Sequence, residues 1–343
     1  MNTKLKSLIA GILLLTATPA IATDIVVFGK FRQFLEIDNI SGSNNDVRQG
    51  VKLTNFVSRV GIRITEPLNE VSPGLKFNAV IDTLFYPDSP MEGLGTAPTT
   101  RSTSLGSNQA TAGFSNEYFT IDFGRQAHAT WKMLSKYGVY SDLFSTPLGE
   151  IHNRRGLRFN NGVFGTLKLT DTITIGYETQ LSEKEDVHNS QTVSIHYTEG
   201  TLNLSLVHFN NGTSENVSNM IGAAYSVNSN TRVALLISRD KISNTTISGT
   251  LFPATTTTGT TLSIRHKIND KWSTEGGYSV RNDDVRAVTA GVQYLLNKNL
   301  AIQIRGQRVT SDDVINFTTA DDLRGGILGT SRTNAGIGIE FTF

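Results

Sequence analysis

The sequence contains no cysteine, and only eight of its 343 residues are proline. Without cysteine the chain can form neither a disulfide framework nor a thiolate metal site, and it has no thiolate nucleophile. Charged residues are also scarce, at 18% of the chain, and the 31 Lys and Arg residues nearly balance the 30 Asp and Glu residues. That balance gives no electrostatic reason to expect a nucleic-acid partner.

Long apolar runs are missing as well, apart from a short one near the N-terminus. There Lys4 and Lys6 precede the run LIAGILLL, and the small residues of AIA follow, ending at Ala22. This order predicts a secretory signal peptide over residues 1–22, because roughly a dozen apolar residues cannot span a bilayer as a helix. Residues 23–343 would then form the mature protein, with 29 basic and 30 acidic residues.

What the mature chain has instead is alternation with a period of two residues. In DIVVFGKFRQFLEI, Ile25, Val27 and Leu35 share one face, whereas Lys30 and Arg32 lie on the other. Such alternation predicts β-strands with one apolar and one polar face. Sixteen such segments can be counted, near residues 24–37, 55–64, 75–84, 108–114, 117–126, 154–160 (with 161–170 as a further extension), 172–181, 191–198, 201–210, 219–228, 231–242, 260–269, 271–282, 285–297, 299–311 and 333–343.

Short polar turns alternate with long irregular gaps between these segments. This asymmetry is typical of an outer-membrane β-barrel, in which lipid-exposed strands must close into a ring so that every backbone amide is paired. A soluble β-sandwich or β-solenoid is the alternative, but no fixed repeat supports a solenoid. The turns lie at 199–201, 227–230, 269–271 and 297–299, and the gaps at 38–50, 85–107, 127–153, 243–259 and 312–332.

We therefore predict an all-β fold, a transmembrane antiparallel β-barrel of 16 strands. A ring of that size leaves a water-filled lumen, because side chains cannot fill it. Aromatic residues near strand ends would form girdles at the membrane interfaces. They are Phe114, Tyr118, Phe119, Tyr197, Phe209, Tyr225, Trp272 and Tyr294.

Three stretches resemble the Gram-negative general porins. SRVGIRITEPL (58–68) resembles the second strand of that family, and FTIDFGRQ (119–126) the strand that leads into the loop folded inside the pore. The terminal GIGIEFTF resembles the last strand of the family, and the resemblance implies that Phe341 and Phe343 present a signal to the barrel-assembly machinery. It also implies a homotrimer in the outer membrane of a Gram-negative bacterium, reached by export through the periplasm.

By the same resemblance, residues 127–153 are the constriction loop, whose acids Asp142 and Glu150 would project into the pore; acids in an ordinary solvated loop are the alternative. Facing them, the family places a ladder of basic residues. Inward positions are also required physically, because a charge facing lipid near the midplane costs ~2–4 kcal/mol. Opposed charges would create a transverse field across the aqueous gap. The predicted basic wall consists of Lys30, Arg32, Arg59, Arg63 and Arg158.

Alternation also places Arg265, Lys267 and Arg305 inward, with Glu275 and Glu340 as acidic counterweights. The slight basic excess favours a mild anion preference, with cation preference as the alternative. We predict a porin that passively admits small hydrophilic solutes and ions. A porin specific for anions, phosphate or oligosaccharides is one alternative.

An outer-membrane barrel enzyme, either a phospholipase or a protease, is an alternative of another class. However, the chain has no H-E-x-x-H, G-x-S-x-G, Walker or dinucleotide motif. We therefore expect no catalytic residue, no cofactor and no metal. The cluster SEKED (182–186) is most simply a solvated surface loop, and binding of divalent ions or lipopolysaccharide is the alternative there.

Overall fold

The computed structural model describes most of the predicted mature chain. Among the residues that it describes, no helix is long and apolar enough to cross a membrane. The predicted signal peptide and the cluster 182–186 lie outside these residues. The described residues are 24–42, 48–54, 58–85, 105–138, 151–152, 158–181, 189–212, 216–242, 245–247, 250–252, 254–317 and 327–343.

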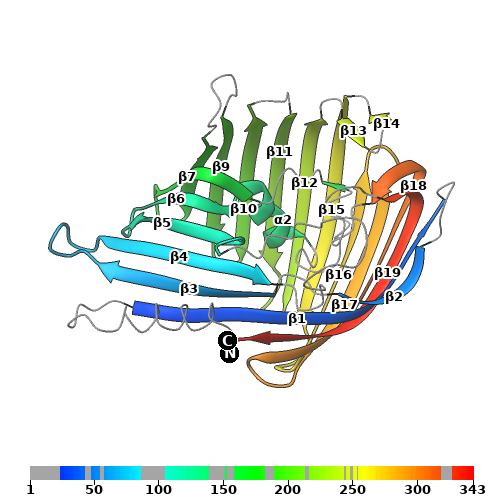
Figure 1. Cartoon of the computed structure of the whole chain (residues 1–343), viewed down its shortest axis with the longest axis horizontal. Coiled ribbons are helices and arrows are strands. Elements are labelled where there is room, and N and C mark those ends of the chain that lie inside the picture. The colour runs from blue at the N-terminus through cyan, green and yellow to red at the C-terminus, as the bar shows by residue number, and fades with distance from the viewer. Residues whose placement is uncertain are drawn as a thin grey trace, which may run out of the picture.

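Seventeen strands form one antiparallel sheet that closes on itself, because β1 (Asp24–Ser41) pairs with β19 (Ile327–Thr342) (Figure 1). β2 (Arg48–Thr54) and β3 (Ser58–Pro67) follow one another and both pair with β1, so they share one position in a sixteen-strand barrel. The predicted fold is therefore confirmed. The other barrel strands are β4 (Lys76–Phe85), β5 (Gln109–Ser115), β6 (Phe119–Ala127), β7 (Arg158–Lys168), β8 (Ile173–Gln180), β9 (Ser190–Glu199), β10 (Leu202–Asn211), β11 (Asn216–Ser226), β12 (Thr231–Ile242), β15 (Thr255–Lys267), β16 (Trp272–Arg281), β17 (Arg286–Leu295) and β18 (Leu300–Phe317).

Several strands are longer than predicted at the end of the barrel that carries the long loops. β1 and β2 continue their pairing into the region 38–50, where the sequence predicted a loop. There the bidentate pair between Asp38 and Arg332, at 2.8 and 2.9 Å, links β1 to β19. Apolar strand faces are needed only where a strand contacts lipid. Backbone hydrogen bonds and polar pairs also hold strands together in water, so the pairing continues here beyond the lipid-facing part.

Two further regions can be compared with the prediction. β7 runs from Arg158 to Lys168, so the strand predicted at 154–160 continues into the predicted extension at 161–170; residues 154–157 lie outside the described part of the chain. A small hairpin of β13 (Thr245–Ile247) and β14 (Thr250–Phe252) forms outside the barrel sheet, within the predicted gap 243–259. Three-residue strands are too short to produce a readable alternation.

The alternation along each strand separates the lumen from the outer surface, as predicted. On β1, Leu35 and Ile37 are 52% and 53% exposed, whereas Phe34 and Glu36 between them are buried. The exposed large aromatics include Phe114, Tyr118, Phe119, Tyr225 and Trp272, as expected for residues at the membrane interface.

Phe209 corrects that prediction. It is buried and packs with Phe159 and Phe164, because the odd positions of β10 face the barrel interior. Phe209 lies near the end of β10, as predicted, but it faces the barrel interior and not the membrane interface.

Candidate functional site

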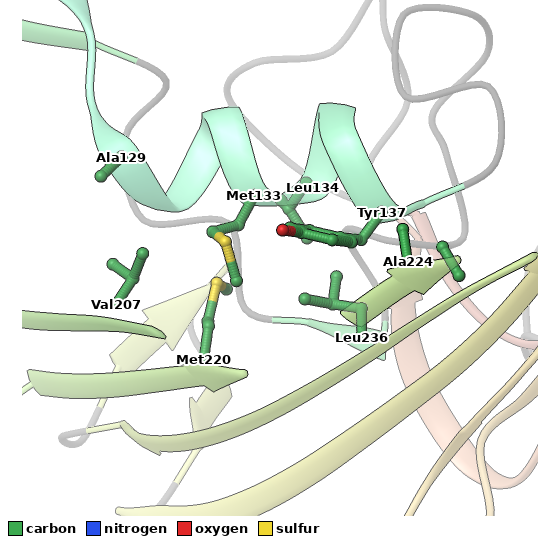
Figure 2. Packing of buried hydrophobic residues seen from close by; sticks show 9 residues of the cluster. Ala129, Met133, Leu134, Tyr137, Val207, Met220, Ala224 and Leu236 are labelled. Carbon is green, nitrogen blue, oxygen red and sulfur yellow. The ribbon is translucent and has the colours of Figure 1, made fainter. Parts of the chain in front are cut away.

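A short helix lies inside the barrel and narrows the lumen. α2 (Ala129–Tyr137) begins just after β6 and packs against the inner face of β10, β11 and β12 (Figure 1). Its apolar side contacts lumen-facing apolar residues of those strands, and Met133 and Met220 meet in the middle of the contact (Figure 2). The predicted inward fold of the loop 127–153 is thus seen in its described part. The buried cluster consists of Ala129, Met133, Leu134, Tyr137, Val207, Met220, Ala224, Ala234 and Leu236.

Polar contacts fix the start of the helix. The Glu178 carboxylate of β8 accepts a hydrogen bond from the backbone N–H of Ala129 at 2.7 Å. It also forms an ion pair with Lys132 at 3.0 Å. A carboxylate at this position also interacts favourably with the positive end of the helix dipole. His128, directly before the helix, stacks against both Phe159 and Phe209, with ring centroids 4.8 and 5.5 Å away.

The end of the helix is fixed by two strands, β10 and β15. The Tyr137 hydroxyl bonds Ser205 of β10 at 2.6 Å, and Ser263 of β15 donates to the Tyr137 carbonyl at 2.8 Å. Arg265 donates to the Gly138 carbonyl at 3.3 Å. The exposed carbonyl groups at the end of a helix attract cations in this way.

Residues 151–152, on the returning part of the loop, are also held on the lumen wall. The buried His152 bonds Ser238 of β12 through Nδ1 and Thr261 of β15 through Nε2, both at 2.8 Å. Ser238 donates in turn to Asp240 at 2.7 Å. Burial lowers the pKa of His152, which lies outside the membrane-spanning strands, to about 3, because the charged form would lose its hydration.

The opposite wall carries most of the predicted basic residues. Lys30 and Arg32 of β1 both form ion pairs with Glu340 of β19, the former at 3.7 Å. Arg59 of β3 pairs with Asp82 of β4 at 3.2 Å. The β1–β3 register places Lys30 beside Arg59, so strand pairing brings these cations together.

Arg63 and Arg158 have different surroundings. Arg63 is exposed, and its guanidinium carbon lies 5.4 Å from the ring centroid of Phe28. Arg158 donates from Nε to the carbonyl of Asn108 at 2.6 Å, and the Asn108 amide reaches Asp82 at 2.6 Å. A chain of hydrogen bonds therefore connects Arg158 with Arg59 through Asn108 and Asp82.

Asp82 and Glu178 were not among the site residues predicted from the sequence. Each is the only carboxylate in a mainly apolar strand, and in a barrel that signal alone places an acid on the lumen side. The predicted loop acids Asp142 and Glu150 lie outside the described residues. No group of three or more His, Asp or Glu side chains that could hold a metal occurs within the described ranges.

The geometry described above is a closed barrel with a loop folded against its inner wall, and the comparisons with known proteins agree with it. The sequence model of a family described as Gram-negative porin matches residues 9–314. The chain belongs to the Gram-negative porin family. A search of curated proteins found no match.

Solved structures support the same fold. The porin resembles an anion-selective porin from Comamonas acidovorans with 16% identity and a TM-score of 0.75, covering 94% of this chain and all of that one. OmpT from Vibrio cholerae in a trimer form is 13% identical with a TM-score of 0.66, over 94% and 100% of the two chains. A mutant porin of Rh. blastica is 14% identical with a TM-score of 0.63, over 93% and 100%. The present chain is thus an outer-membrane porin, with the channel of that family.

Proposed function

We propose that this porin is a passive diffusion channel that prefers small hydrophilic anions. The proposal depends mainly on the charge of the lumen wall formed by β18, β19, β1, β3 and β4, which lies opposite α2. Apart from the Asp38–Arg332 pair, which cancels, lumen-facing cations outnumber acids there: the cations are Lys30, Arg32, Arg59, Arg63 and Arg305, and the acids are Glu36, Asp82 and Glu340. A channel lined by an excess of one sign favours ions of the opposite sign.

The unneutralised part of this wall includes Arg63. Among the described residues its guanidinium has a ring contact with Phe28 and no acidic partner, whereas Arg59 is already paired with Asp82. We propose Asp142 and Glu150 as the acids of the facing loop, so that the two sides create a transverse field. The similar structure from Comamonas acidovorans is described as anion-selective, which supports the same preference.

The reversal potential of the purified protein in a planar bilayer under a KCl gradient tests this proposal. We expect a sign that indicates chloride preference. Arg63→Gln should move the potential toward zero, because it removes a lumen cation without leaving an unpaired acid. Arg286→Gln is the control, since Arg286 is exposed at the far end of β17 beside Asp284. A potential of the opposite sign would overturn the anion preference.

The assembled state is part of the same proposal. We propose a homotrimer, which the trimer form of OmpT from Vibrio cholerae supports; conductance steps in groups of three in the same recordings are expected. Residues 1–22 would direct export, and Phe341 and Phe343 would be recognised by the barrel-assembly machinery. The outer surface would contact outer-membrane lipid and lipopolysaccharide.

We further propose that the protein is a channel and not an enzyme. A Ser–His–Asp group does occur beside the loop, but Ser238 lies between His152 and Asp240. In a catalytic triad the carboxylate orients the histidine, which then activates the serine. Here the carboxylate binds the serine, and all three side chains are buried. The arrangement therefore suits an anchor for the loop better than hydrolysis.

A further inference from the structure

A recess in the lumen wall lies apart from the basic wall described above. It has a volume of about 480 Å³ and lies at the short-turn end of β12, β15, β16 and β17, which run side by side (Figure 1). Arg265 is one of its lining residues and donates a hydrogen bond to the Gly138 carbonyl at the end of α2. A solute that passes the constriction therefore meets this recess near the mouth of the channel.

The charges in the recess leave one guanidinium available. Arg232, Arg265 and Lys267 line it together with Glu275. Arg265 is held by Glu275 at 2.7 Å, and Lys267 by Asp270 at 2.7 Å. Within the described part of the chain, Arg232 has no hydrogen-bond or ion-pair partner, although the strand register places it directly beside Arg265.

The remaining lining is rich in hydroxyl and amide groups. Ser226, Ser273 and Gln293 occupy lumen-facing positions on β11, β16 and β17. Such side chains both donate and accept hydrogen bonds, so they suit a ligand with hydroxyl groups. A guanidinium suits a carboxylate, which it can bind through two parallel hydrogen bonds. The volume falls within the range of small-molecule sites, ~300–1,000 Å³.

We propose that this recess binds small hydroxylated carboxylates, the class that includes sugar acids, with Arg232 as the charge partner. The recess would act as a low-affinity station that raises the local concentration of such solutes at the mouth. The inference rests on the proposed passive channel, because the solute must reach the recess through an open lumen.

Planar-bilayer recording with three probes separates charge from hydroxyl recognition. Gluconate has both features, propionate has only the carboxylate, and glucose has only the hydroxyls. We expect gluconate to reduce or interrupt the KCl current at lower concentration than either of the others. Equal potency of gluconate and propionate on the wild-type protein would overturn the proposal, since the hydroxyl lining would then contribute nothing.

Substitutions of Arg232 test whether this residue is the charge partner of the carboxylate. In Arg232→Gln, the gluconate concentration that halves the KCl current should rise at least about fivefold, which is the size expected from the loss of a charge-assisted hydrogen bond. Arg232→Lys should lie between the wild type and Arg232→Gln, because it keeps the charge but not the two parallel hydrogen bonds, and Arg286→Gln should behave as wild type. Unchanged gluconate sensitivity in Arg232→Gln would overturn the proposal. If that variant does not fold, the three-probe comparison on the wild-type protein decides.

The reversal potential from the same recordings keeps the two proposals separate. A cation-selective potential with retained gluconate recognition would overturn the general anion preference and leave the recess intact. An anion-selective potential without gluconate recognition would overturn the recess proposal and leave the general anion preference intact.

Discussion

Gly222 of β11 lies directly against the ring of Tyr137, at the end of α2. A Cβ atom added to Gly222 would overlap the ring of Tyr137, so Gly222→Ala must displace the ring or the helix. Overpacking of this kind typically costs ~1–3 kcal/mol. We expect a lower unfolding temperature and a changed single-channel conductance, because Tyr137 also holds the helix to Ser205.

Gly165→Ala is the matched control for that substitution. Gly165 lies in β7, and the nearest atom to its added Cβ would be 3.7 Å away, an ordinary contact. Its conductance and unfolding temperature should therefore match the wild-type values. If Gly222→Ala behaves like this control, the close packing of Tyr137 on the wall does not determine the position of the helix.

Single residues also show how far alternation can predict a site. Alternation placed Lys30, Arg32 and Arg59 on the lumen face, because in a barrel each strand has one wet and one lipid face. It could not give their partners. Asp82 reaches Arg59 only because the β3–β4 register brings the two strands together, and alternation within one strand contains no information on register.

At the scale of elements, the returning part of the constriction loop depends on a neutral histidine. The folded-state pKa of His152 is about 3, against ~6.5 in an unfolded chain. Below pH 6.5 the unfolded chain therefore binds a proton that the folded chain does not. The free energy of unfolding should therefore decrease as the pH is lowered below 6.5, by up to ~1.4 kcal/mol per pH unit, until the pH approaches the pKa of His152 in the folded state.

Unfolding in urea at pH 7 and pH 4 measures this effect. The wild-type protein should lose more stability between the two pH values than His152→Gln, which has no proton to bind at this position. His208→Gln is the control, because His208 is exposed on β10 and bonds Asn219; its loss should equal that of the wild type. Equal losses in all three proteins would show that His152 does not contribute to acid sensitivity.

The elements themselves differed in how well they could be predicted. The segment TWKMLSKY, which forms most of α2, has apolar residues at helical spacing, so the sequence itself favours a helix there. The position of the helix against β10, β11 and β12 has no such signal, because Val207, Met220 and Leu236 look like any other apolar residues of a barrel strand. Only the closed barrel shows that they lie on the lumen side, where polar residues are usual.

At the scale of the whole molecule, the ring closes where the first and last barrel strands, β1 and β19, meet. The backbone groups of Gly29 and Phe343 exchange hydrogen bonds at 2.9 and 3.1 Å. The Phe343 ring covers Gly29, where an added Cβ would overlap it. Closure between β1 and β19 could be expected from the sequence, because a sheet in lipid cannot keep an open edge.

The terminal residue can act in closure or as an assembly signal, and one variant separates these roles. In Phe343→Ala the backbone pairing of β1 with β19 can remain, since it extends from Lys30 to Ser41. Folding of the purified chain in detergent should therefore stay close to wild type. If Phe341 and Phe343 form the proposed signal, the amount assembled in the outer membrane of cells should nevertheless fall several-fold.

Tyr118→Ala is the control for the loss of an exposed aromatic at the same end of the barrel, since Tyr118 is 60% exposed in a short turn. It should assemble normally in cells, because it removes apolar contact with the interface but not the end of the last strand. Equal assembly defects in both variants would indicate a role for interfacial aromatics in general. A defect of Phe343→Ala already present in detergent would show that Phe343 acts through closure of the ring, and the signal proposal would fail.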